Sequence, residues 1–226
     1  MKKEKFVLVF DIGSSKLRAM FAGRGLNNTF NIKGYKEIEY DGFYEGNFLK
    51  QEKLSNLFQQ IIEELDIEPN KKINKVYIGV PAEFSSVRSS EVSINFGDRR
   101  KIKKADIDSL FYMASEKAKS ADVEVVSVNP INYSLDDGRF TLTPIGESAN
   151  SISANLSIIY ADKEYIELFN SIVAGLNFES VEYISEPLAQ VLFVMPKEKR
   201  EDLSLLVDVG DLTTSIAFAK GEGLIG

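Results

Sequence analysis

The sequence predicts an α/β fold, with a mixed sheet and flanking helices, interrupted by a small inserted β-α-β-β subdomain. Apolar runs of strand length alternate with amphipathic segments of helical length, which is typical of layered α/β proteins. The strand pattern becomes polar and alternating after Pro81 and returns to continuous apolar runs at Leu156. An apolar hairpin with an Asp-x-Gly turn also occurs twice, near the two ends of the chain.

The composition narrows the chemistry that the chain can perform. Its 226 residues include no Cys and no His, which excludes disulfides, thiolate nucleophiles and imidazole bases. A site must therefore use carboxylates, hydroxyls, lysine, backbone amides and a hard cation such as Mg²⁺. The net charge of −7 argues against nucleic-acid binding. No apolar run reaches the roughly 18–20 residues of a membrane span, so we expect a cytoplasmic protein.

The first part of the chain begins with a predicted hairpin. The apolar run 6–10 suggests a strand buried on both faces, the segment 11–16 interrupts it, and 17–21 resumes the strand pattern. Strand-like segments follow at 31–35 and 36–40. Apolar residues at helical spacing then predict an amphipathic helix over 51–65, and 76–80 reads as a buried strand that Pro81 ends.

The segment 82–156 is expected to form the inserted unit. An exposed strand over 87–94 precedes a helix whose first turn holds Asp106 and Asp108, where the helix dipole favours acidic residues. The strand segments 123–128, 132–135 and 140–142 follow, the last two joined by an Asp-Asp-Gly turn.

The main fold is expected to resume at strand 156–160. A helix capped by Asp162 and ending near Gly175 leads to strand 181–185. A second helix begins at Pro187 and ends before Pro196.

The last two strands, 203–209 and 215–219, form an apolar hairpin. We expect it to exchange with a second chain, in preference to docking on its own first lobe, because an exposed apolar edge promotes association. The side chains expected to be buried there are Leu205, Val207, Ile216 and Phe218.

The repeated hairpin is the motif that points to a ligand. FVLVFDIGSSKLRAMFAG at 6–23 matches LSLLVDVGDLTTSIAFAKG at 203–221. One copy is compatible with a plain hairpin turn, but a glycine in a tight turn also lets backbone N–H groups approach phosphate oxygens. Nearby hydroxyls add donors, Lys16 adds a positive charge, and Asp11 and Asp208 can hold Mg²⁺ through its waters.

These segments resemble the phosphate loops of the actin-like ATPases, with DIGSSK at 11–16 as the first loop and DVGDLTT at 208–214 as the second. SEPLAQ at 185–190 is similar to the segment that connects the two lobes in that superfamily. The position of the insert at 82–156 resembles the layout of the FtsA family of bacterial cell-division proteins, or of its pilus-associated relative PilM.

The resemblance implies ATP and Mg²⁺ as cofactors, with Asp11 and Asp208 near the metal. Glu186 would position the attacking water; its alternative role is to stabilise the helix that starts at Pro187. Asp211 and Leu212 replace a Gly-Gly pair of the family's second loop, and hydrolysis is not expected of this chain alone. The residues implied to contact phosphates or metal are Asp11, Gly13, Ser14, Ser15, Lys16, Asp208, Gly210, Thr213 and Thr214.

The resemblance also implies a function. An FtsA-like protein would polymerise into filaments and link the FtsZ division ring to the inner face of the cell membrane at the septum. The first lobe would comprise 1–81 and 157–202, and 203–226 would begin the second lobe. We expect the adenosine site, the FtsZ-binding subdomain and a membrane helix to lie after Gly226. The alternative is a PilM-like adaptor that grips a peptide through the insert; a sugar or acetate kinase half is less favoured, because no substrate-binding Arg and carboxylate group is visible.

A basic run within the insert has two interpretations. Five of the six residues 99–104 are Lys or Arg. The run is either a solvated loop before a helix or a docking surface for an acidic partner or an anionic membrane.

Overall fold

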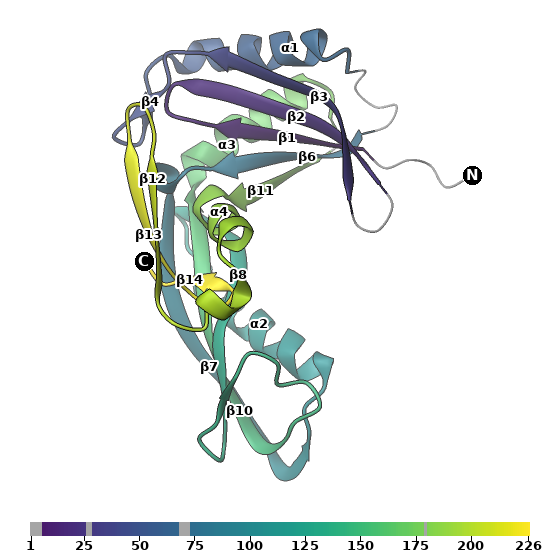
Figure 1. Ribbon diagram of the computed structural model, residues 1–226, viewed down its shortest axis with the longest axis vertical. Coiled ribbons are helices and arrows are strands. Elements are labelled where there is room, and N and C mark those ends of the chain that lie inside the picture. Colours follow the sequence, from purple (N-terminus) through teal and green to yellow (C-terminus); the bar gives the residue numbers. More distant parts are fainter. Residues whose placement is uncertain (1–5, 26–28, 68–72, 179) are drawn as a thin grey trace, which may run out of the picture. The chain divides into compact units, whose positions relative to one another are not determined.

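The computed structural model describes residues 6–25, 29–67, 73–178 and 180–226 (Figure 1). The chain divides into two compact units, which are described separately. Unit 1 comprises Met1–Phe84, Lys163–Glu186 and Asp208–Ser215; unit 2 comprises Ser85–Asp162, Pro187–Val207 and Ile216–Gly226.

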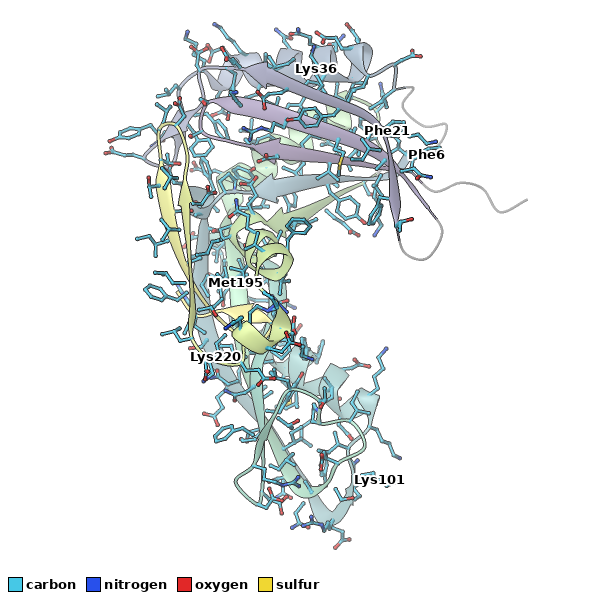
Figure 2. The ribbon with its side chains drawn as sticks, viewed as in Figure 1. Phe6, Phe21, Lys36, Lys101, Met195 and Lys220 are labelled. Atoms are coloured by element: carbon cyan, nitrogen blue, oxygen red, sulfur yellow. The ribbon has the colours of Figure 1, made fainter. Side chains whose placement is uncertain are left out.

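Unit 1 is built on a five-stranded mixed sheet with the order β11-β6-β1-β2-β3 (Figure 1). The strands are β1 (Phe6–Ile12), β2 (Lys16–Arg24), β3 (Phe30–Glu39), β6 (Ile73–Val80) and β11 (Val181–Ser185). β2 pairs antiparallel with β1 and β3, whereas β6 pairs parallel with β1 and β11. The predicted hairpin is thereby confirmed; at one end of it the rings of Phe6 and Phe21 stack with centroids 5.2 Å apart (Figure 2).

The core of unit 1 lies between this sheet and two helices. Helices α1 (Leu54–Glu64) and α3 (Lys163–Gly175) contribute Phe58 and Phe169, whose ring centroids are 5.6 Å apart. Phe10 of β1 stacks on Phe58 at 4.2 Å. β1 is fully buried only at alternate positions, so the prediction of burial on both faces is wrong. The continuous apolar run reflects one core face and one half-exposed face.

Short elements complete unit 1. β4 (Phe43–Tyr44) pairs with β5 (Asn47–Phe48), and a 3₁₀ turn at Gln51–Lys53 begins the predicted helix before α1. A second 3₁₀ turn, Ala82–Phe84, packs Phe84 against this hairpin. Aromatic rings from these segments and from α3 form one cluster: Phe43, Phe48, Phe84, Tyr165 and Phe169.

Unit 2 contains the inserted subdomain, a four-stranded sheet of order β7-β10-β8-β9 that packs against helix α2 (Lys104–Ala118). The strands are β7 (Ser85–Lys101), β8 (Val123–Leu135), β9 (Phe140–Thr141) and β10 (Ser148–Asp162). β7 pairs with β10, as expected for a subdomain separate from the main sheet. β8 joins the predicted segments 123–128 and 132–135 into one strand. The predicted strand 156–160 lies in the last part of β10, in the sheet of the insert.

The rest of unit 2 consists of most of α4 (Glu186–Val194) and most of a sheet of order β12-β13-β14. Its strands are β12 (Ser204–Val209), β13 (Thr214–Lys220) and β14 (Gly223–Leu224). They share one apolar cluster with β10, formed by Ile159, Leu188, Val191, Ala217, Ala219 and Leu224. In the described ranges, no helix combines the length and apolar character that a membrane crossing needs.

The face of the β12–β13 hairpin that packs on the chain is opposite to the predicted one. Leu205, Val207, Ile216 and Phe218 are 51%, 50%, 58% and 42% exposed. The buried positions are the small Ala217 and Ala219, with Leu206 packed beside them. Strand alternation distinguishes the two faces, but the face with the larger apolar side chains is the exposed one here.

Replacing Gly221 with alanine should destabilise the protein more than replacing Gly138, although both have positive φ, 63° and 83°. The left-handed backbone costs either alanine about 1–2 kcal/mol. A Cβ at Gly221 would also overlap the Ile131 carbonyl oxygen, whereas nothing lies within 4 Å at Gly138. We expect a further loss of about 1–3 kcal/mol for Gly221→Ala in urea unfolding. Equal losses would contradict the packing of residue 221 on β8.

Candidate functional site

The two Asp-x-Gly segments adopt the same turn in unit 1. In the first loop (residues 13–15, between β1 and β2), the Gly13 N–H donates to the Lys16 carbonyl at 3.0 Å. In the second loop (residues 210–213, between β12 and β13), the Gly210 N–H donates to the Thr213 carbonyl at 2.9 Å. A Cβ on either glycine would lie 3.0 Å from that same oxygen. The sequence repeat is therefore a repeat of backbone geometry.

A side-chain hydrogen bond joins the two loops. The Leu212 N–H donates to Ser14 Oγ at 3.2 Å, although the two residues are 198 positions apart. Ser14 is 7% exposed, so this hydroxyl is held in place by its surroundings. Gly210 also faces it, because a Cβ there would lie 3.4 Å from Ser14 Oγ. The structure thus brings both predicted loops together, as two facing hairpins require.

An ionic network borders the first loop. Lys16, predicted to bind phosphate, directs its Nζ to Glu37 at 2.7 Å. Arg18 donates to Glu37 at 2.8 Å and to Asp11 at 3.0 Å. Hydrogen bonds from Lys16 and Arg18 hold the pKa of Glu37 at about 2. Arg18 and Glu37 were not identified from the sequence, because alternating charges on a strand are also typical of a solvated face.

Glu186 is the first residue of α4 and reaches across to β1. Its Oε1 accepts the Ile12 N–H at 3.2 Å. Gly79 of β6 makes room for this carboxyl group, since a Cβ at residue 79 would overlap Glu186 Oε1. Gly79 was also missed by the sequence analysis. A glycine inside an apolar strand is a signal of close approach that could have found it.

The surroundings of Glu186 favour its protonated form. Burial is the main cause that raises the pKa of Glu186 well above its usual range, followed by the charge of Asp11 and, more weakly, that of Asp208. A protonated carboxyl group donates a hydrogen bond but cannot accept a proton. The charges of Asp11 and Asp208 therefore act on Glu186 even though the three residues come from three distant segments.

The donor set suits a hard divalent cation. Carboxylate and hydroxyl oxygens are the ligands that Mg²⁺ prefers, and it often keeps several waters. A positive charge beside Asp11 and Asp208 would also offset the repulsion that raises the pKa of Glu186. Across the described residues no three acidic side chains are placed to hold a metal together. The role of Asp11 and Asp208 through metal-bound water stays a prediction.

The other predicted hydroxyls lie on the same two turns. Ser15 and Thr213 are partly exposed, and Thr214, the first residue of β13, is exposed. Asp208 lies near the end of β12 and Asp211 lies within the second loop, where it is exposed. Their contact with a phosphate stays a prediction.

The basic run of unit 2 is partly structural. Arg100 binds both carboxylate oxygens of Asp106 at 2.8 Å and lies 3.7 Å from the centroid of the Phe96 ring. Arg100 and the backbone of Lys103 hold the pKa of Asp106 at about 2. The remaining basic side chains of the run are exposed: Arg99, Lys101, Lys103 and Lys104. Whether they meet a partner stays a prediction.

Replacing Asp11 with asparagine should lower the pKa of Glu186 towards its ordinary range. The substitution removes the charge that most opposes ionisation of Glu186, while burial still keeps the pKa raised. The matched control is Asp66→Asn, at a residue with φ of 53° that asparagine tolerates. Carboxyl ¹³C NMR titration measures the effect. An unchanged Glu186 titration in Asp11→Asn would contradict the coupling.

Known proteins share sequence and fold with this chain. Residues 84–160 match the SHS2 domain inserted in FtsA. The cell division protein FtsA of Pseudomonas aeruginosa is 23% identical over 96% of this chain, and that of Streptococcus pneumoniae is 22% identical over 99%. The chain spans about half the length of these relatives, 52% and 49%. A solved PilM-PilN type IV pilus biogenesis complex superposes with a TM-score of 0.61 at 15% identity, covering 98% of this chain and 60% of that one.

The mixed sheet, the two facing glycine-closed turns and these likenesses define an actin-like fold. Within that class, the chain is FtsA-like: the FtsA-type SHS2 domain occupies its insert, and FtsA proteins match it on both sides of that insert.

Proposed function

We propose that the two facing loops hold the phosphates of a nucleotide, ATP with Mg²⁺. The observation that carries the proposal is the pair of identical glycine-closed turns joined by the Ser14–Leu212 hydrogen bond. Lys16 would exchange the Glu37 carboxylate for a phosphate. Bound Mg²⁺ would offset the negative charge of the phosphates. The proposed contacts are Asp11, Gly13, Ser14, Ser15 and Lys16 from one side, and Asp208, Gly210, Thr213 and Thr214 from the other.

We propose that Glu186 positions water at this site. Its carboxyl group accepts a hydrogen bond from Ile12 of the neighbouring strand β1, which supports a role beyond stabilising its own helix. The raised pKa of Glu186 works against proton abstraction. This supports slow hydrolysis, with the nucleotide acting chiefly as a bound ligand.

The 226-residue chain should bind ATP and inorganic tripolyphosphate with similar, millimolar affinity, about −4 kcal/mol, if the loops recognise only phosphates. Calorimetry in the presence of Mg²⁺ measures both ligands. Ser14→Ala should weaken tripolyphosphate binding about fivefold, the effect of losing one hydrogen bond. Ser109→Ala, which removes a hydroxyl bonded within α2, serves as its control. Micromolar binding of ATP alone, about −8 kcal/mol, would contradict phosphate-only recognition.

At the level of the cell, we propose that the protein carrying this sequence acts in division. It would polymerise and link an FtsZ ring to the inner face of the membrane, as a peripheral cytoplasmic protein. Support comes from the match to FtsA proteins along the chain and from the FtsA-type insert. A second candidate is a PilM-like adaptor that binds a peptide, which the TM-score of 0.61 to the PilM-PilN complex favours.

The protein isolated from its own cells should co-purify with FtsZ and not with peptides from pilus inner-membrane proteins. The expected result is an FtsZ band that depends on the tagged protein and is missing from an untagged strain. A synthetic tail of a pilus inner-membrane protein, added as competitor, should not displace it. Capture of that tail without FtsZ would overturn the division proposal and support the adaptor.

A further inference from the structure

The segment Tyr40–Gly42, between β3 and β4, lies along the back of the first loop. The Tyr40 N–H donates to the Ser15 carbonyl at 3.0 Å, and the Tyr40 hydroxyl donates to the Gly13 carbonyl at 2.8 Å. Gly42, with φ of 78°, faces the Ser14 carbonyl so closely that a Cβ would overlap its oxygen. All three carbonyl groups of the loop are therefore directed towards this segment.

This orientation determines where the loop's N–H groups point. In a trans peptide, the C=O of one residue and the N–H of the next point in opposite directions. Because the Gly13 and Ser14 carbonyls face the segment 40–42, the N–H groups of Ser14 and Ser15 face away from it. Within the described structure these two N–H groups have no hydrogen-bond acceptor. Successive N–H groups on one side of a turn form a concavity that suits an anion.

We propose that Tyr40 is the positioning residue of the phosphate loop: its hydroxyl and N–H hold the carbonyls of Gly13 and Ser15, so that the Ser14 and Ser15 N–H groups stay directed at a phosphate. The inference rests on the proposed function, that this loop binds phosphates. Gly42 is part of the same device, because only a residue without a Cβ leaves room for the Ser14 carbonyl.

The surroundings of Tyr40 keep its hydroxyl protonated, so that it can donate a hydrogen bond. Burial is the main cause that raises the pKa of the Tyr40 phenol, so the hydroxyl keeps its proton over the physiological range. Tyr40 is only partly exposed, unlike its neighbours Glu39 and Asp41, which are exposed. No sequence motif marks this tyrosine.

The test compares two tyrosine variants in unit 1 that each lose one hydroxyl bonded to a main-chain carbonyl. Tyr40→Phe removes the bond to the Gly13 carbonyl. Tyr183→Phe removes the contacts of the Tyr183 hydroxyl with the Ile166 carbonyl at 3.0 Å and with Asn170 Oδ1 at 2.9 Å. The probe is inorganic tripolyphosphate with Mg²⁺, measured by calorimetry, and stability is measured by urea unfolding. We expect similar losses of stability, but a rise of about fivefold in the dissociation constant for Tyr40→Phe alone.

A second readout reports on the loop without any ligand. In ¹³C and ¹⁵N NMR spectra, Tyr40→Phe should shift the Gly13 carbonyl signal and increase the mobility of the Ser14 and Ser15 amides, and Tyr183→Phe should leave them unchanged. The glycine pair Gly42→Ala and Gly46→Ala shares a positive φ, 78° and 71°, but only residue 42 contacts the loop. Gly42→Ala should therefore weaken tripolyphosphate binding more than Gly46→Ala.

The outcomes separate this inference from the proposed function. If the unaltered chain binds tripolyphosphate and Tyr40→Phe binds it equally well, the positioning role is overturned and the phosphate site stands. If the unaltered chain shows no saturable binding, the proposed function fails and the inference fails with it. Equal weakening by Tyr40→Phe and Tyr183→Phe would mean that both act through stability, which also overturns the positioning role.

Discussion

The candidate site depends on one backbone constraint: the carbonyl groups of the first loop are held by the segment 40–42, which leaves the Ser14 and Ser15 N–H groups on the other side. Each loop begins with a glycine whose N–H closes the turn, and the Cβ of any other residue would press on the closing carbonyl. Ser14 then ties the loops together by accepting the Leu212 N–H. The first loop follows the apolar strand β1, and the second loop follows β12.

The same constraint explains why small residues occur around the site. Gly42 admits the Ser14 carbonyl, and Gly79 admits the Glu186 carboxyl group. Each removes a side chain where an oxygen needs the space, one on the connection after β3 and one inside β6. The carboxyl group that Gly79 admits is partly desolvated, and this burial, more than its acidic neighbours, raises the pKa of Glu186. The close packing that Gly79 permits therefore raises the pKa of Glu186.

The sequence predicts the parts of this arrangement that are local. The two Asp-x-Gly turns and the insert with its single helix follow from spacing and periodicity, and the match between the two hairpins holds at the level of hydrogen bonds. The contacts that join distant segments do not follow: Tyr40 lies 27 residues from Gly13, and Ile12 lies 174 from Glu186. In β12 and β13 the pattern also predicts the wrong face, because the larger apolar side chains are exposed and small ones such as Ala217 and Ala219 are buried.

The two loops form the same turn but differ in the contacts that hold them. The first loop is held from behind by Tyr40 and bordered by the ion pairs of Arg18 and Glu37. For the second loop, the described contacts are its own turn and the bond to Ser14, and Asp211 and Leu212 there are exposed. A bond that the first loop supplies therefore stabilises the second one. The Ser14 hydroxyl accepts the Leu212 N–H and still has its own proton to donate, so this one side chain can serve both loops.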